Sequence, residues 1–264
     1  MNRNQPKIVF FDIDDTLYIK GERRVPDSAR QALAALRRRG TVTAIATGRT
    51  PAVLPEAVKS LIGEGIDILV CINGQYVARG GEVLAHFPMD AAAVSELTEK
   101  LTACGIAVGH VSHRGITVSH ESGGLLRATR DLGIAYADMP SVAAGQPVYQ
   151  MLAFYPPQRE AEVAALLPEG IKTVRWHAEA VDLLDADGSK ARGIAAVLAH
   201  LGWQAADAAA FGDGLNDLEM MAAVGFGVAV GNAVPELKAV ADYIAPPVDS
   251  DGLARALRDL GWID

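Results

Sequence analysis

The chain has 264 residues, of which 50% are hydrophobic and 21% are charged, enough for one large or two modest globular domains. Its formal net charge of −8 argues against a nucleic-acid-binding surface. No apolar run approaches the roughly 18 residues that a membrane span needs, and the amino-terminal residues lack the hydrophobic region of a signal peptide. We therefore expect a cytoplasmic protein with neither a membrane nor a nucleic acid as partner.

The two cysteines, Cys71 and Cys104, are far apart in the sequence and lie in apolar contexts. Buried thiols are favoured over a disulfide or a metal site, in agreement with a reducing compartment.

The segment KIVFFDIDDTL near the amino terminus predicts a strand that ends in acids. Ile8–Phe11 is apolar and β-branched or aromatic, as in a strand buried on both faces. Asp12 and Asp14 follow, and residues two apart in an extended backbone project from the same side. Two such carboxylates repel each other unless a cation such as Mg²⁺ lies between them, and Thr16 adds a hydroxyl at the turn. An acidic turn with solvated carboxylates explains this segment alone equally well.

The next segments predict further strand ends with polar residues. A helix is expected to start at Pro26-Asp27-Ser28 and to end at Gly40. Val42–Ala46 predicts a second buried strand, which ends in Thr47-Gly48-Arg49 before Thr50-Pro51, a pair typical of a helix start. A hydroxyl and a glycine at such a place are suited to bind phosphate, although many turns contain them.

A third strand is expected at residues 66–72, followed by hairpin turns at Asn73-Gly74 and Gly80-Gly81. Strands that alternate with helices at this spacing predict an α/β fold with a doubly wound, Rossmann-like parallel sheet. Ligands of such sheets bind outside the carboxyl ends of the strands, which is where Asp12, Asp14 and Thr47 lie.

Residues 82–182 show short alternating strands interleaved with helices, which predict an α+β insert with a sheet of its own. Helices are expected at residues 89–101 and 159–167. Strands are expected at residues 106–111, 116–120, 148–155, 171–176 and 181–184, with a looser stretch at 123–147. For His110, His113 and His120, surface or hinge positions are favoured over a zinc site. Structural or solvated roles are likewise favoured over substrate contacts for Trp176, His177, Arg114, Arg127, Arg130 and Arg175.

The α/β pattern resumes near residue 183. Lys190 is predicted at the first turn of a helix, which is the unfavourable end for a cation unless it faces a phosphate or the carboxylates of the first strand. A very apolar strand at residues 206–211 then leads into Gly212-Asp213-Gly214-Leu215-Asn216-Asp217. A turn rich in Gly, Asn and Asp explains this segment by itself, but not four such segments at four strand ends.

Four short motifs carry a resemblance to the haloacid dehalogenase superfamily, and their order and spacing resemble the Cof-type phosphatases. They are Asp12-x-Asp14-x-Thr16, Thr47-Gly48-Arg49, Lys190, and Gly212-Asp213-Gly214-x-Asn216-Asp217. The resemblance implies a core domain of residues 1–84 and 184–264 with an α/β cap domain at 85–183. Asp15 stands where glycine is commonest, and Gln75 where a small residue is usual.

The resemblance also implies a role for each residue. Asp12 would be the nucleophile and Asp14 the general acid and base. Mg²⁺ would be held by the Asp12 and Asp213 carboxylates and by the backbone carbonyl of Asp14. The phosphoryl oxygens would be bound by Thr47, the backbone N–H of Gly48, Lys190 and Asn216. Asp217 and Thr16 would orient the residues that bind the metal and the phosphate, without binding either one themselves.

The expected activity is Mg²⁺-dependent hydrolysis of a small phosphorylated metabolite, either a sugar phosphate or a phosphorylated cofactor. Two alternatives stay open: a phosphotransferase resembling phosphomannomutase, and a sensor that binds a phosphorylated ligand without turnover. Intact Asp12, Asp14, Lys190 and Asp213 argue against the sensor. We expect a monomer or a weak homodimer.

Overall fold

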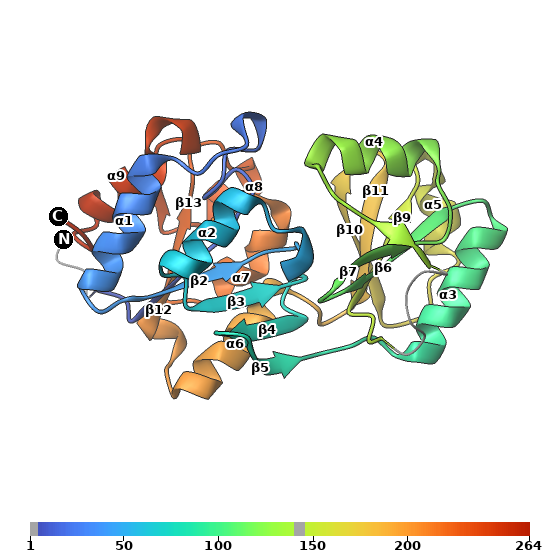
Figure 1. Ribbon diagram of the computed structural model, residues 1–264, viewed down its shortest axis with the longest axis horizontal. Helices are drawn as coiled ribbons and strands as arrows, with labels where there is room; N and C mark the ends of the chain where they lie inside the picture. The colour runs from blue at the N-terminus through green and yellow to red at the C-terminus, as the bar shows by residue number, and fades with distance from the viewer. Residues whose placement is uncertain (1–4, 140–145) are drawn as a thin grey trace. The chain divides into compact units, whose positions relative to one another are not determined.

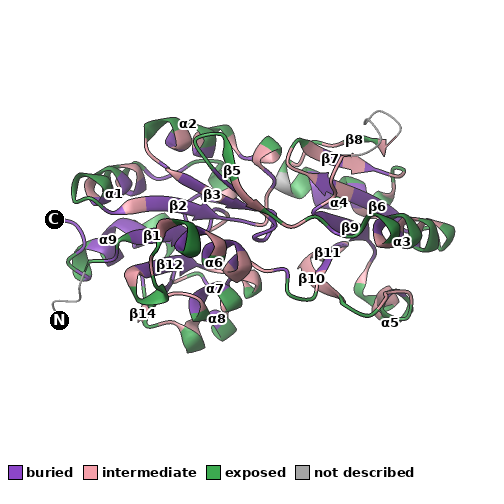
Figure 2. Ribbon diagram, turned by 90° about the horizontal axis from the view of Figure 1, so that it is seen from below, coloured by how far each residue is buried: buried purple, intermediate pink, exposed green. Residues whose placement is uncertain are grey.

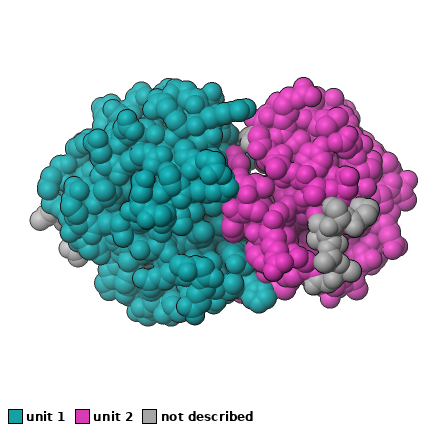
Figure 3. All heavy atoms as spheres, in the orientation of Figure 1, with its two compact units in different colours: residues 1–48, 54–86, 189–264 teal, residues 49–53, 87–188 magenta. Residues whose placement is uncertain are grey.

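The computed structural model describes residues 5–139 and 146–264. Two compact units result from the contacts within the chain (Figure 3): unit 1 is Met1–Gly48, Leu54–His86 and Ser189–Asp264, and unit 2 is Arg49–Val53 and Phe87–Gly188. Residues 87–183 of the predicted insert thus lie in unit 2. The segment Arg49–Val53 lies within residues 1–84 of the expected core domain but belongs to unit 2.

Unit 1 contains an eight-stranded sheet in the order β14-β13-β12-β1-β2-β3-β4-β5 (Figure 1). The first six strands of this order run parallel, and β4 and β5 are added as antiparallel hairpins. The strands are β1 (Ile8–Phe11), β2 (Val42–Ala46), β3 (Ile68–Cys71), β4 (Tyr76–Arg79), β5 (Glu82–His86), β12 (Ala208–Gly212), β13 (Phe226–Ala229) and β14 (Tyr243–Ile244). The predicted parallel α/β sheet is confirmed.

Helices cover both faces of this sheet because its central strands are apolar on both sides. Alternate residues of β1 point into two separate cores, with Val9 and Phe11 in one and Ile8 and Phe10 in the other. The central strands are accordingly purple in Figure 2. The first core is closed by α1 (Asp27–Arg38), α2 (Glu56–Glu64) and α9 (Gly252–Asp259), and the second by α6 (Lys190–Leu201), α7 (Leu218–Ala222) and α8 (Pro235–Val240).

Unit 2 has a six-stranded sheet in the order β10-β11-β9-β6-β7-β8, antiparallel except for the β7–β8 pair. Its strands are β6 (Ala107–Ser112), β7 (Gly115–Val118), β8 (Ala137–Asp138), β9 (Gln150–Phe154), β10 (Ile171–His177) and β11 (Ala180–Asp185). Its helices are α3 (Ala91–Ala103), α4 (Gly123–Leu132) and α5 (Glu160–Ala164). Leu97 and Leu101 of α3 pack against Val108 and Met151 of the sheet.

The expected helix start at Thr50-Pro51 is wrong. Only a 3₁₀ turn forms at Pro51–Val53, and α2 begins at Glu56 after a second proline, Pro55. A residue before proline avoids the helical region, so Leu54 separates the two elements. The Thr50 hydroxyl donates to the Ser112 carbonyl (2.6 Å) instead of capping a helix.

The looser stretch predicted in the insert is also partly wrong, since it contains α4. Ser122 caps this helix by accepting the N–H of Leu125 at 3.1 Å. Gly123 and Gly124 occupy only the first turn of α4, so that the interior of the helix contains no glycine. Residues 140–145 of the expected stretch, Gly145 among them, lie outside the described residues.

Cys71 is buried as expected, but Cys104 is exposed because it ends α3 at the turn before β6. Both thiols are free. Among the helices of the described residues, none combines the length and apolarity that a membrane crossing demands.

Candidate active site

Three neighbouring parallel strands place the predicted residues at one edge of the sheet of unit 1. Phe11 of β1 pairs with Phe211 of β12 and with Ile45 of β2. Parallel strands in register end together, so the residues that follow them emerge side by side. Asp12, Thr47 and Asp213 are these residues.

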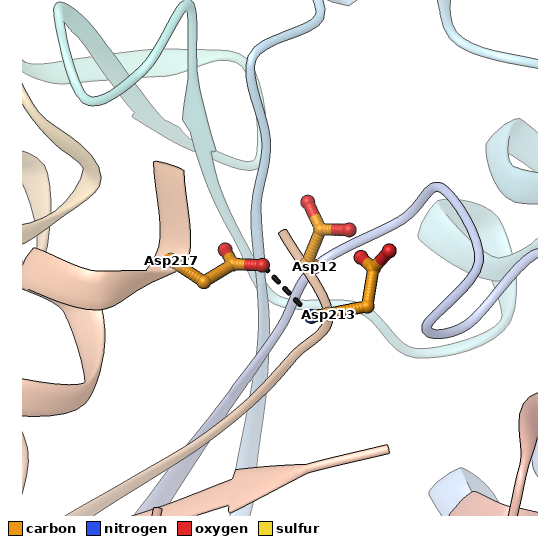
Figure 4. Close-up of side chains that lie close together, drawn as sticks. All are labelled: Asp12, Asp213 and Asp217. Atoms are coloured by element: carbon orange, nitrogen blue, oxygen red, sulfur yellow. Dashed lines mark hydrogen bonds between the residues drawn. The ribbon is translucent and has the colours of Figure 1, made fainter. Parts of the chain in front are cut away.

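Asp12, Asp213 and Asp217 each offer a carboxylate oxygen, and these atoms lie within 4.8 Å of one another (Figure 4). The group is the only one with metal-binding character among the described residues. The Asp14 carboxylate is not part of this group. Asp14 lies between the end of β1 and the following turn, in an isolated bridge with Tyr18, and the turn begins at Asp15, which has a φ of +60°.

Lys190 is the first residue of α6, after the capping residue Ser189, and it is completely buried. Its Nζ donates to Asp12 Oδ1 at 2.5 Å and to Asp217 Oδ1 at 2.6 Å. A lysine at a helix amino terminus thus faces the carboxylate of the first strand, which is one of the two reasons that the sequence suggested for it.

Lys190 and Asp12 influence each other's protonation. Burial lowers the pKa of Lys190, but the charges and hydrogen bonds of Asp12 and Asp217 outweigh it, so that the pKa is raised and the ammonium stays charged. Burial raises the pKa of Asp12 well above its usual value. Lys190 opposes this rise, and three neighbouring carboxylates add to it. The site therefore holds more negative charge than Lys190 neutralises.

Asp213 is half-buried and shows the same excess of negative charge. Burial, followed by the charge of Asp217, raises the pKa of its carboxyl to about 6, although Lys190 acts in the opposite direction. The Thr16 hydroxyl donates to Asp213 Oδ1 at 3.1 Å. Thr16 thereby fixes the carboxylate from the turn that follows β1.

Asp217 organises the loop after β12. Its Oδ2 accepts the backbone N–H groups of Asp213 (2.9 Å) and Gly214 (3.0 Å), and the first of these bonds is the dashed line in Figure 4. A Cβ on Gly212 would lie 2.6 Å from the Asp217 carboxyl, so only glycine allows this carboxylate to approach the backbone. Asp217 is fully buried and bonds to Lys190 with its other oxygen.

Three of the residues predicted to bind phosphate, Thr47, Gly48 and Asn216, lie next to Asn73, which the sequence indicated only as part of a turn. Asn73, 2% exposed, donates its backbone N–H to the carbonyl of Thr47 (3.0 Å) and accepts from Asn216 Nδ2 with its side chain (3.2 Å). Thr47 is buried and Gly48 is half-buried. The Asn-Gly pair was visible in the sequence, but nothing there indicated which residues it contacts.

A second lysine, which the sequence analysis did not single out, lies beside Asp15. Lys20 Nζ is 2.9 Å from Asp15 Oδ2, and the backbone N–H of Lys20 donates to Asp15 Oδ1 at 3.1 Å. Asp15 adopts a φ of +60°, which explains why glycine is expected at this position, and aspartate tolerates that conformation better than most residues. Asn232 Nδ2 donates to the carbonyl of Asp15 at 2.7 Å.

Three basic side chains of unit 2 that the sequence offered as substrate contacts bond to acids of the same unit. Arg127 bonds to Glu179 (2.8 Å), Arg175 to Glu160 (2.5 Å) and His177 to Asp131 (3.1 Å). These contacts agree with the structural roles favoured for them from the sequence.

Comparisons with known proteins match almost the full length of the chain. A family model described as haloacid dehalogenase-like hydrolase matches residues 9–257. The protein named "Putative phosphatase YkrA" from Bacillus subtilis (strain 168) is 36% identical over 269 residues, which cover 97% of this chain and 98% of that one. A solved structure of a hypothetical protein from Geobacillus kaustophilus HTA426 is 38% identical with a TM-score of 0.87, covering 98% of this chain and 100% of that one. The subclass IIB sugar phosphatase BT4131 is 30% identical with a TM-score of 0.86, covering 97% and 100%.

Proposed function

We propose that this chain, which belongs to the haloacid dehalogenase-like hydrolases, hydrolyses a small phosphorylated metabolite with Mg²⁺ through a phosphorylated Asp12. It is a phosphatase of that family. The observation that carries the proposal is the buried contact of Asp12 with Lys190, next to Asp213 and Asp217. A surface turn has no need of a buried lysine between two carboxylates.

In the first step, a carboxylate oxygen of Asp12 attacks phosphorus, and the bond from phosphorus to the ester oxygen breaks. Asp14 gives its proton to that oxygen, which leaves as the alcohol. In the second step, water attacks phosphorus of the aspartyl phosphate while Asp14 takes a proton from it. The carboxylate of Asp12 and inorganic phosphate are the products, so that the protein returns to its starting state.

Four groups are assigned to the phosphoryl oxygens. Lys190 uses two of its three N–H bonds on Asp12 and Asp217, and the third serves a phosphoryl oxygen. The Thr47 hydroxyl, the Gly48 N–H and the Asn216 amide supply further donors. Charge neutralisation and positioning are the main requirements of phosphoryl transfer.

The residues present fit a hard divalent cation. Carboxylate oxygens are the ligands that Mg²⁺ prefers, and the raised pKa values of Asp12 and Asp213 reveal the negative charge that such an ion would offset. Asp12 and Asp213 would hold it with the backbone carbonyl of Asp14, while Thr16 and Asp217 orient the ligands. When bound, the ion neutralises charge on the phosphoryl group.

For the substrate class we propose a sugar phosphate or a phosphorylated cofactor. The similarity to BT4131, which is a sugar phosphatase, and the net charge of −8, which disfavours nucleic acid, support a small molecule.

The test is release of inorganic phosphate from p-nitrophenyl phosphate and from a panel of sugar phosphates and phosphorylated cofactors, with Mg²⁺ and with EDTA. We expect release from a few related compounds that stops with EDTA. If the folded protein releases phosphate from none of these compounds, the proposal is contradicted. An isomerised sugar phosphate that forms only with a bisphosphate activator would instead establish the phosphotransferase.

A further inference from the structure

The backbone after β3 adopts an uncommon conformation over three consecutive residues. Ile72, Asn73 and Gly74 have φ values of +53°, +48° and +85°. Glycine and asparagine tolerate the left-handed region, but a β-branched residue such as Ile72 is a genuine outlier there. Strain of this kind persists only where the surroundings enforce it, and it gathers at functional sites.

The surroundings do enforce it. Asn73 is 2% exposed, Ile72 is fully buried, and a Cβ on Gly74 would lie 2.0 Å from the carbonyl oxygen of Ser189, directly before Lys190. The turn is therefore packed tightly against the amino terminus of α6.

The turn directs Asn73 to residues from two distant parts of the chain. Its backbone N–H donates to the Thr47 carbonyl at 3.0 Å, and Thr47 in turn donates to Val70 at 2.8 Å. Its side-chain Oδ1 accepts from Asn216 Nδ2 at 3.2 Å.

Gly48 lies against the same carboxamide. A Cβ on Gly48 would be 3.1 Å from Asn73 Oδ1 and 3.4 Å from Nδ2, closer than side chains usually approach. Asn73 thus bonds to Thr47 through its backbone and to Asn216 through its side chain, and its carboxamide borders Gly48, so that it contacts three of the four residues assigned above to the phosphoryl oxygens.

We propose that Asn73 is a positioning residue of the phosphate site: it fixes the backbone at Thr47 and Gly48 and orients the Asn216 amide toward the phosphoryl group. The inference rests on the proposed function. One N–H of the Asn216 amide is used on Asn73, which leaves the other for a phosphoryl oxygen. An asparagine that only formed a turn would have no effect on phosphate once the turn itself is preserved.

The experiment therefore uses Asn73→Gly, which removes the carboxamide but keeps the positive φ accessible. Inorganic phosphate is the probe, and its dissociation constant is taken from the rise in melting temperature with phosphate concentration. We expect phosphate affinity to fall about tenfold, KM to rise by a similar factor and kcat to change little, because a lost hydrogen bond weakens binding by this order. Arg23→Gly, a glycine introduced at another positive φ (+53°), is the matched control and should bind phosphate as the wild type does.

Two further variants sharpen the test. Asn216→Ala should weaken phosphate binding, and the double variant Asn73→Gly/Asn216→Ala should lose less affinity than the two single losses multiplied together, since both single variants remove the hydrogen bond between Asn73 and Asn216. Asn73→Asp keeps the acceptor and tolerates the φ, so it serves if Asn73→Gly does not fold. Its added negative charge should weaken phosphate binding further.

Wild-type affinity in Asn73→Gly and in Asn73→Asp, or losses that multiply in the double variant, would overturn the inference. Failure of the proposed function is separate and concerns the wild type, which would then release phosphate from no substrate.

Discussion

The two lysines near Asp12 and Asp14 occupy opposite environments. Lys190 is completely buried and lies between Asp12 and Asp217, both of them buried as well. The side chain of Lys20 is 39% exposed, and that of its partner Asp15 is 32% exposed. We call the first group the buried centre and the Asp15–Lys20 pair the rim.

Both lysines have raised pKa values, yet the two regions differ in what the ion pair does. At the rim, burial lowers the pKa of Lys20 and is outweighed by the hydrogen bond and charge of Asp15, with smaller effects of Asp14 and Asp213. Water can replace either partner there, so the pair contributes little to stability. In the buried centre no water replaces a lost partner, and removal of one charge leaves the others uncompensated. The lysine–aspartate ion pair is therefore required for stability in the buried centre, whereas at the rim it can be lost at little cost.

The largest effect is expected from Lys190→Met. It leaves Asp12 and Asp217 buried without their cation, which should cost about 3 kcal/mol of the free energy of unfolding. Phosphate release should fall at least about a hundredfold, since a buried donor to the phosphoryl group is lost. Denaturant unfolding and steady-state rates measure the two effects.

The matched comparison for this variant is Lys20→Met, which should cost about 1 kcal/mol or less. Equal losses of stability from the two substitutions would break the distinction between the buried centre and the rim.

An intermediate effect concerns pH and Asp213. Its pKa of about 6 exceeds the usual value of 3.8, so the folded state binds this proton more tightly than the unfolded state does. Stability from this group is full below about pH 4 and is lost as the pH rises to about 6. Asp213→Asn should therefore gain melting temperature relative to the wild type through this window, measured in EDTA.

Asp207, at the other end of β12, provides a control of opposite sign. Hydrogen bonds from the Gln204 backbone and from Lys7 lower the pKa of its carboxyl, so its contribution is present above the usual value and is lost as the pH falls. Asp207→Asn should lower the melting temperature at pH 6 and have less effect in acid. If the difference in melting temperature between Asp213→Asn and the wild type does not change from about pH 4 to about pH 6, the raised pKa of Asp213 is contradicted.

The smallest effect is expected at the rim. Asp15→Gly keeps the positive φ accessible but releases Lys20, and Lys20→Met removes the cation near Asp14. Each should lower kcat/KM about two- to fivefold, in keeping with an exposed ion pair. The double variant should equal either single one, because both break the same pair.

Lys59→Met is the matched control, since Lys59 is 40% exposed and bonds to Glu56 at 2.7 Å on α2. It should leave kcat/KM unchanged. A hundredfold loss at the rim would show that Lys20 belongs to the catalytic centre.

The sequence was sufficient for the strand ends because the signals there are local. An apolar run that stops at an acid, as at Phe11 and Asp12, predicts both the strand and the residue that emerges from it. Lys190 stood out because a cation at a helix amino terminus requires an anion.

Asn73 and Lys20 were missed because their importance lies in contacts between distant segments. The partner of Asn73 is Asn216, and no local pattern encodes that distance in the sequence. The helix α4 was missed for a different reason, because its signal is local: Ser122 caps it, but the two glycines in its first turn have low helix propensity and resemble a loop.

The measurement that tests the central claim most directly is chemical trapping of the phosphorylated residue. The protein is mixed with Mg²⁺ and excess p-nitrophenyl phosphate, treated with borohydride, and digested for mass spectrometry, with Asp12→Asn as the control. We predict that the peptide with residues 8–20 carries an alcohol in place of the Asp12 carboxyl, and that the control peptide is unmodified. Turnover with an unmodified Asp12, or undiminished phosphate release by Asp12→Asn, would contradict the account.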